Sequence, residues 1–284
     1  NRCSFEIHIE RINHMKHLLT IAGSDSGGGA GIQADIKAFS AHGCYAMSVI
    51  TAVTAQNTCA VTAVQDITPE MIGAQMDAVF SDIRVDAVKI GMVSQIASIR
   101  MIAEKLRQYC PRLIVVDPVM VSKSGFHLLQ PDAVEVLKQE LVPLAVMLTP
   151  NIPEAEILTD MSIVTPEDRK RAALKLKDMG AAYVLIKGGH LQDTAEDLLY
   201  DGKQFYTYGG ERIETKNTHG TGCTLSSAIA ANLANGMTAE QAVRAAKEYI
   251  TVGIRNGLEL GAGCGPTNHF YTLYRKAGMA DDKE

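Results

Sequence analysis

Short apolar runs alternate with longer amphipathic stretches along most of this 284-residue chain, and this alternation limits the folds that it can adopt. Several of the apolar runs contain hardly any polar residue, which is typical of parallel strands covered by helices on both faces. Strands are predicted at residues 18–22, 48–54, 87–90, 113–116, 146–149 and 183–186, and helices at 32–42, 69–81, 95–108, 131–141, 166–179 and 239–256. The order of these elements predicts an α/β fold with a mostly parallel central sheet, flanked by helices on both faces.

The two segments outside this alternation predict an edge and an extension. Residues 195–216 predict a small antiparallel edge of the sheet, because they contain three short strand-like stretches, at 198–200, 205–208 and 212–215. Residues 1–14 differ from the rest and precede Met15, which we expect to be the natural start. We expect them to be an upstream extension or an expression remnant, and residues 15–284 to form a single domain.

The composition excludes several classes of protein. With 46% hydrophobic and 21% charged residues the chain is typical of a soluble globular protein, and a formal net charge of −5 without a basic run argues against a nucleic-acid partner. No apolar run approaches the roughly 18 residues of a membrane span. None of the six cysteines forms a C-x-x-C pair, which indicates reduced thiols and predicts a cytoplasmic protein.

An anion site is predicted where the segment Asn217-Thr218-His219-Gly220-Thr221-Gly222-Cys223-Thr224 leads into a helix of small residues. Glycine lets the backbone approach a ligand closely, and a helix start presents unpaired N–H groups with a partial positive charge. Cys223 falls in the first helical turn, where the helix dipole favours its thiolate. A phosphate cradle that contains a potential base predicts phosphoryl transfer. The alternative is a turn before a buried helix with a core cysteine.

A second glycine-rich segment, Gly23-Ser24-Asp25-Ser26-Gly27-Gly28-Gly29-Ala30-Gly31, follows the first predicted strand. It is neither a dinucleotide fingerprint nor a Walker loop, because Ile32 stands at the last glycine of the first pattern and Gly29 at the lysine of the second. It predicts a loop that wraps a small ligand, or a plain turn. Gln56 ends the second predicted strand. Its amide both donates and accepts, so it could pair with an aminopyrimidine edge or face solvent.

Polar residues also end three later strands, where ligands bind in parallel α/β sheets. Asn151 and Glu154 form a capping-box pattern, and their oxygens could also lie near Mg²⁺, directly or through water. Lys187 could offset the charge of a transferred phosphoryl group, or could be a surface lysine. Asp117 could orient a cation or a ligand hydroxyl, or could simply end its strand.

Taken together, these segments resemble the ribokinase superfamily, and within it the hydroxymethylpyrimidine/phosphomethylpyrimidine kinases of thiamine biosynthesis. The resemblance runs from about Lys16 to Gly265. Besides the segments already described, the matching motifs within it are residues 51–58, 89–92 and 117–120. It implies a ribokinase-like fold and an ATP- and Mg²⁺-dependent enzyme that is usually a homodimer. Such enzymes phosphorylate the hydroxymethyl group of 4-amino-5-hydroxymethyl-2-methylpyrimidine, and then phosphorylate that product to the diphosphate.

The resemblance also implies a role for each candidate residue. Catalysis would involve Cys223, the backbone of Gly220 and Gly222, and Lys187. The pyrimidine pocket would consist of Gln56, Ala30, Thr54, Met92 and Val119, with Asp35 near the acceptor. ATP and its phosphates would contact Thr218, Thr221, Lys187 and Asn151, and Mg²⁺ would lie near Glu154, Asn151 and Asp117. Family members often have valine at the position of Thr54, so this wall would be slightly more polar here.

Cys223 and Gln56 distinguish this chain from other ribokinase relatives. Most of them carry an aspartate base at the position of Cys223, whereas the pyridoxal kinases that resemble this group share the cysteine but tend to have methionine at the position of Gln56. We therefore expect the pyrimidine as substrate, with a pyridoxal kinase or a dual-specificity enzyme as the alternative. Cys223 would be the base of the first transfer, or would shape the anion site. A non-catalytic sensor with this fold would be expected to lack Cys223, Asn151, Glu154 or Lys187, and all four are present.

Overall fold

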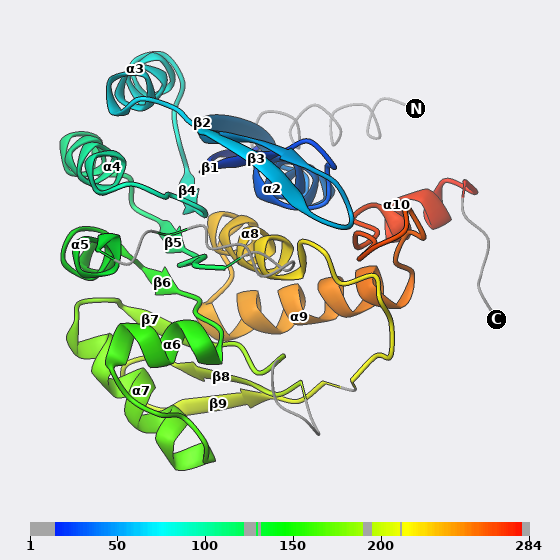
Figure 1. Ribbon diagram of the computed structural model, residues 1–284. Helices are drawn as coiled ribbons and strands as arrows, with labels where there is room; N and C mark the ends of the chain where they lie inside the picture. The colour runs from blue at the N-terminus through cyan, green and yellow to red at the C-terminus, as the bar shows by residue number, and fades with distance from the viewer. Residues whose placement is uncertain (1–14, 122–128, 130–131, 190–194, 211, 280–284) are drawn as a thin grey trace, which may run out of the picture.

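Nine strands form one mixed sheet in the order β3-β2-β1-β4-β5-β6-β7-β8-β9 in the computed structural model, which describes residues 15–121, 129, 132–189, 195–210 and 212–279 (Figure 1). The strands are β1 (His17–Asp25), β2 (Tyr45–Gln56), β3 (Val61–Asp66), β4 (Ala87–Ile90), β5 (Ile114–Val116), β6 (Met147–Leu148), β7 (Tyr183–Ile186), β8 (Asp197–Tyr200) and β9 (Phe205–Tyr208). The predicted extension, residues 1–14, lies outside the described residues.

The centre of the sheet is parallel and both of its edges are antiparallel. β2, β1, β4, β5, β6 and β7 pair in parallel, as the apolar runs predict. β8 and β9 add the antiparallel edge that was expected. The prediction of a further strand at 212–215 is wrong, because these residues pair with no strand. At the other edge, β3 folds back on β2 as an antiparallel strand that the sequence analysis did not predict.

Helices cover the two faces of the sheet as separate layers (Figure 1). They are α2 (Gly31–Ala41), α3 (Pro69–Phe80), α4 (Ile96–Tyr109), α5 (Ala133–Glu140), the short 3₁₀ helix η1 (Val142–Leu144), α6 (Ile152–Thr159), α7 (Pro166–Asp178), α8 (Thr221–Ala234), α9 (Ala239–Arg255) and α10 (Tyr271–Lys276). The helices α3 to α7 share one apolar core with the sheet, and α2, α8 and α9 share the other. Within the described residues, no helix is both long and apolar enough to cross a membrane.

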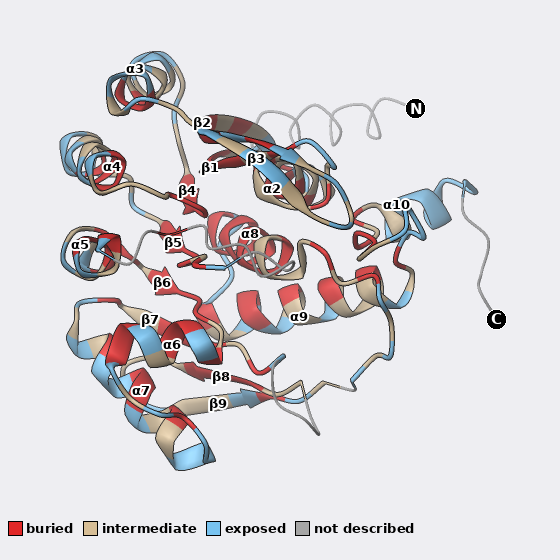
Figure 2. Ribbon diagram, viewed as in Figure 1, coloured by how far each residue is buried: buried red, intermediate tan, exposed pale blue. Residues whose placement is uncertain are grey.

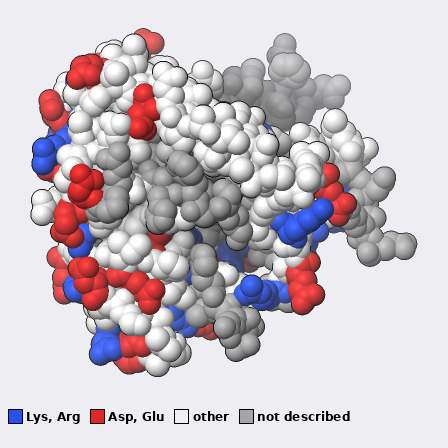
Figure 3. All heavy atoms as spheres, in the orientation of Figure 1, with Lys and Arg blue, Asp and Glu red and all other residues white. Residues whose placement is uncertain are grey.

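The two cores explain why the central strands are mostly apolar. In β4, Val88 belongs to the first core and Ala87 to the second, and in β6 the same division separates Leu148 from Met147. Successive side chains of a strand point to opposite faces, so a strand with a core on each face favours apolar residues at nearly every position. Figure 2 shows the central strands buried between the two helix layers, whereas the edge strands β3 and β9 and the helix α10 are partly or largely exposed. On the face seen in Figure 3, acidic and basic side chains neighbour one another.

One buried ion pair interrupts this apolar interior. Lys89 in β4 donates from its Nζ to both carboxylate oxygens of Asp35 in α2, each at 2.9 Å, and both side chains are 0% exposed. The same carboxylate accepts from the hydroxyls of Thr20 in β1, at 2.6 Å, and Ser227 in α8, at 2.7 Å. Two strands and two helices are therefore joined at a single carboxylate.

We expect Asp35→Asn to lower the free energy of unfolding by about 3–5 kcal/mol, because it leaves the Lys89 ammonium buried without a counter-ion. Urea unfolding followed by circular dichroism measures this change. The control is Lys170→Ala, which removes the exposed ion pair between Lys170 and Glu167 and should leave the unfolding curve almost unchanged. Equal curves for Asp35→Asn and the parent protein would contradict the central role of this pair.

Candidate active site

The carboxyl ends of the parallel strands meet at one edge of the sheet (Figure 1), and several of the predicted site residues end or follow these strands. β1 ends at Asp25 and β2 at Gln56. Asp117 directly follows β5, while Asn151 and Lys187 follow β6 and β7 and pair with each other as an isolated bridge. The start of α8 lies beside them, because Ser226 in this helix donates to Asp117 Oδ2 at 3.2 Å.

The two glycine-rich segments lie against each other. Gly220 caps α8 with a φ of +76°, a left-handed conformation that favours glycine. A Cβ atom at this position would lie 1.8 Å from the carbonyl oxygen of Gly29, so only glycine fits. Two further contacts lie in the second segment. The hydroxyl of Thr221 donates to the carbonyl of Thr218 at 2.7 Å, and the Thr218 hydroxyl lies 3.4 Å from Cys264 Sγ. The first turn of α8 therefore lies next to the first glycine-rich segment.

Lys187 lies between two carboxylates next to this first turn. Its Nζ donates to Asp117 Oδ1 at 2.6 Å and lies 4.0 Å from Glu154 Oε2. A Cβ atom at Gly222 would lie 3.5 Å from Nζ, so the ammonium group and the helix start face the same space. Burial lowers the pKa of Lys187, but the charges of Asp117 and Glu154 outweigh it and hold the pKa above its ordinary value. The ammonium is therefore available to bind an anion.

Asn151 and Glu154 form the capping box at the start of α6. Glu154 Oε2 accepts from the Asn151 backbone N–H at 2.8 Å, and Asn151 Oδ1 accepts from the Glu154 backbone N–H at 2.9 Å. Burial raises the pKa of the Glu154 carboxyl to about 7, with Lys187 opposing this shift and Asp117 adding to it. The predicted capping box is thus present. Because the pKa of Glu154 is close to neutral pH, a nearby cation would decide whether this carboxyl is protonated.

Asp117 and Glu154 are the residues here that could hold a magnesium ion. Among the described residues, no three His, Cys, Asp or Glu side chains form a metal-binding cluster. Mg²⁺ in kinase sites is usually held by one or two carboxylates together with substrate phosphates and water. The two carboxylates on either side of Lys187 fit this donor set, whereas Asn151 already uses its amide oxygen as a helix cap.

Cys223 is half-buried in the first turn of α8. Burial raises the pKa of its thiol to about 11, the charge of Lys89 opposes this shift, and the carboxylates of Asp35 and Asp117 add to it. The expectation that the helix start favours the thiolate is therefore wrong for this structure. Burial and the two nearby carboxylates outweigh Lys89 and the backbone hydrogen bond of Gly31, which favour the thiolate.

Asp35 lies beneath the site rather than in it. The sequence analysis placed it near the acceptor, but its side chain is 0% exposed and its oxygens accept from Lys89, Thr20 and Ser227. Of the other predicted pocket residues, Thr54 and Met92 are buried and Ala30 and Val119 are half-buried.

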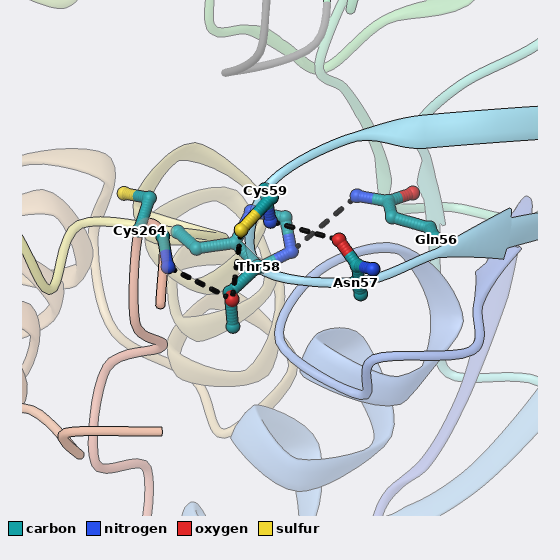
Figure 4. A pocket seen from close by; sticks show the side chains of 7 residues that line it. Gln56, Asn57, Thr58, Cys59 and Cys264 are labelled. Atoms are coloured by element: carbon teal, nitrogen blue, oxygen red, sulfur yellow. Dashed lines mark hydrogen bonds between the residues drawn. The ribbon is translucent and has the colours of Figure 1, made fainter. Parts of the chain in front are cut away.

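A cavity of about 350 Å³ opens beside the glycine loops (Figure 4). It is lined by Gln56, Asn57, Thr58, Cys59, His219, Gly263 and Cys264. Figure 4 shows the amide of Gln56 pointing into it from the end of β2. The opposite wall is held to the β2–β3 turn by the backbone of Cys264, which donates to the carbonyl of Thr58 at 2.8 Å. Gln56 is therefore placed to contact a small ligand here.

Two residues of the site, Asp25 and His219, had no role in the sequence analysis. Asp25 is 3% exposed, and its carboxylate accepts from the backbone N–H groups of Gly27, Gly29 and Ala30 at 2.8–3.0 Å. His219 lies next to it and lines the cavity. A lone acidic residue at the start of a glycine loop was the available signal, but its histidine partner is 194 residues away in the chain.

Comparison with known proteins agrees with this geometry. Residues 25–268 match the family described as Phosphomethylpyrimidine kinase. The chain belongs to this family. It is 54% identical over 261 residues to the hydroxymethylpyrimidine/phosphomethylpyrimidine kinase of Rhizobium meliloti (strain 1021), an alignment that covers 90% of this chain and 98% of that protein. Membership makes the chain a phosphotransferase of the kinase type.

Solved structures of two relatives share the fold. The phosphomethylpyrimidine kinase of Clostridium difficile 630 is 52% identical with a TM-score of 0.76, and the match covers 83% of this chain and 98% of that one. The pyridoxal kinase of Bacillus subtilis, solved as an ADP complex, is 39% identical with a TM-score of 0.85, and the match covers 91% of this chain and 99% of that one. The ribokinase-like fold that the sequence predicts is thus confirmed.

We expect Gly220→Ala to reduce kinase activity about 100-fold or more, because the added Cβ must push the two glycine loops apart and misplace the start of α8. Steady-state ATP turnover measures the loss. The matched control is Gly236→Ala, just after the other end of α8: its φ is +93°, but a Cβ there meets no atom within 4 Å. That variant should lose about 1–2 kcal/mol of stability and keep its activity. Equal activity losses would contradict the contact between the loops.

Proposed function

We propose that this protein transfers the γ-phosphoryl group of ATP to 4-amino-5-hydroxymethyl-2-methylpyrimidine, and then to the resulting monophosphate, in thiamine biosynthesis. The observation that supports it most directly is the Gln56 amide, which points into a cavity next to the start of α8 (Figure 4). An aminopyrimidine presents an amino donor beside a ring-nitrogen acceptor, and a Gln amide matches this pair with one acceptor and one donor.

Phosphates would bind between the start of α8 and Lys187. The backbone N–H groups of the first turn provide donors, and Lys187 provides a fixed positive charge at the same place. Mg²⁺, when bound through Asp117 and Glu154, would supply further neutralisation of the phosphate charge. Catalysis of phosphoryl transfer consists mostly of positioning and charge stabilisation, and the rigid strand ends that carry these residues serve both.

The two transfers place different demands on Cys223. The first acceptor is an alcohol, whose proton has to leave as the oxygen–phosphorus bond forms. A thiol with a pKa of about 11 is a strong base once deprotonated, although its thiolate is scarce at neutral pH. The second acceptor is a phosphate monoester that carries about −1.5 to −2 charge at pH 7, so it needs no base. The homodimer, the cytoplasmic location and the single domain over residues 15–284 stay predictions.

Product analysis tests the proposed function. The purified protein is given ATP, Mg²⁺ and either hydroxymethylpyrimidine or pyridoxal, and the products are identified by mass spectrometry. We expect mono- and diphosphorylated pyrimidine with little pyridoxal phosphate, because pyridoxal offers Gln56 a phenol and an aldehyde instead of an amino group beside a ring nitrogen. Preferred phosphorylation of pyridoxal, the reaction named for the Bacillus subtilis relative, would overturn the substrate and keep the phosphate site.

We expect Cys223→Ala to slow the first phosphorylation about 100-fold or more and the second less than tenfold, because only the alcohol needs a base. Single-turnover assays that start separately from the alcohol and from the monophosphate measure the two steps. The parent protein provides the reference ratio of the two rates. Equal losses in both steps would show that Cys223 shapes the anion site instead.

A further inference from the structure

Asp25 and His219 form a buried pair next to the cavity. His219 Nε2 lies 2.8 Å from Asp25 Oδ2, and the two side chains are 11% and 3% exposed. Two contacts hold His219 in place. Its backbone N–H donates to the carbonyl of Gly265 at 3.0 Å, and its ring packs against Gly29, where a Cβ atom would lie 2.4 Å from the ring. The ring therefore has little freedom to turn away from Asp25.

The proton on this ring can be assigned from its partner. Burial raises the pKa of Asp25, but the hydrogen bonds from His219 and from the backbone of Ala30 and Gly27 outweigh it and hold the pKa below its ordinary value. An ionised carboxylate only accepts hydrogen bonds, so His219 Nε2 has to carry the proton and donate it to Asp25. His219 Nε2 then has no lone pair to offer to any other group.

Gln56 lies between His219 and Thr54. Its Nε2 is 3.5 Å from His219 Nε2, and its Oε1 is 3.2 Å from Thr54 Oγ1 (Figure 4 shows the first contact as a dashed line). In this direction the amide N–H groups would face a nitrogen that only donates. The single hydroxyl proton of Thr54 is already donated to the carbonyl of Ser24 at 2.8 Å, so Thr54 offers Gln56 an acceptor.

Both neighbours thus require the opposite direction of the amide. A half-turn about its last bond exchanges the oxygen and the nitrogen without moving any other atom. The Gln56 oxygen then faces His219 Nε2, whose one proton is already donated to Asp25 Oδ2, so that no two donors oppose each other. The Gln56 nitrogen donates to Thr54 Oγ1, whose own proton is donated to the carbonyl of Ser24.

We infer that His219, fixed by Asp25, is a positioning residue that sets the direction of the Gln56 amide and thereby the specificity for an aminopyrimidine. This inference rests on the proposed function. The amino group of the substrate would lie on the side of the cavity that His219 lines, where it donates to the amide oxygen of Gln56. The adjacent ring nitrogen of the substrate would lie toward Thr54. With the amide reversed, donor would meet donor at the amino group.

The test compares two substrates, hydroxymethylpyrimidine and 5-hydroxymethyl-2-methylpyrimidine, which lacks the 4-amino group. The ratio of their kcat/KM values reports how well the amino group is recognised. His219→Phe keeps a ring of similar size against Gly29 but removes the N–H that opposes the amide nitrogen of Gln56. We expect it to reduce the ratio about tenfold, mainly through KM of the amino substrate, because a misdirected amide loses its hydrogen bond and leaves polar groups unpaired.

Two further variants separate positioning from a structural role. His219→Gln restores an N–H donor and should return the ratio to within about threefold of the parent. In a Gln56→Leu background, His219→Phe should leave the ratio unchanged, because the amide through which it acts is gone. Equal loss for both substrates, no rescue by His219→Gln, or an undiminished effect in the Gln56→Leu background would each overturn the inference.

Failure of the inference is distinguishable from failure of the proposed function. A parent protein that does not phosphorylate hydroxymethylpyrimidine contradicts the function. If the parent does phosphorylate it, and the ratio falls in Gln56→Leu but keeps the parent value in His219→Phe, the proposed function stands. His219 then has no role in specificity.

Discussion

The buried ion pair of Lys89 and Asp35 is the contact on which the rest of the site depends. It joins β4 and α2 directly, and the hydroxyls of Thr20 and Ser227 bring β1 and α8 to the same carboxylate. Taking both charges out of water is costly, and an apolar pair of the same volume could be at least as stable. Apolar side chains would, however, leave α2 and α8 free to slide along the sheet. The ion pair with its four hydrogen bonds allows a single register.

That register decides how the two glycine loops meet. The first loop leads directly into α2 and the second into α8, so fixing these helices brings Gly29 and Gly220 into contact. Loops of small residues have few side chains with which to hold a shape. Here one carboxylate, that of Asp25, holds the first loop through three backbone N–H groups and holds the second through His219. The same burial that makes the site rigid also raises the pKa of the Cys223 thiol, despite its place at a helix start.

The sequence predicted what depends on local pattern and missed what depends on distant pairs. The parallel centre of the sheet, the helices on both faces and the Asn151–Glu154 cap follow from periodicity and from neighbours three residues apart, and all are present. β3 was missed because none of residues 61–66 is buried and they show no apolar run. Asp35 was assigned to the acceptor from the family resemblance, and nothing near it in the sequence shows its partner, Lys89, 54 residues later. A lysine inside an otherwise apolar strand was the available sign that a buried counter-ion had to exist.

The candidate site consists of two neighbouring groups of residues, one that carries charges and one that lines the cavity. The charged groups proposed for phosphate and Mg²⁺, namely Lys187 for the first and Asp117 and Glu154 for the second, come from the ends of β5 and β7 and from α6. The groups that face the small-molecule cavity come mainly from β2 and the turn that follows it. The Gly29–Gly220 contact and the Asp25–His219 pair connect the two loops at the boundary. Substitutions in the cavity therefore leave the phosphate charges in place, so a change of substrate within this fold needs few residues. His219 is an exception, because it belongs to the predicted anion segment and yet lines the cavity, so it lies at the boundary between the two proposed parts of the site.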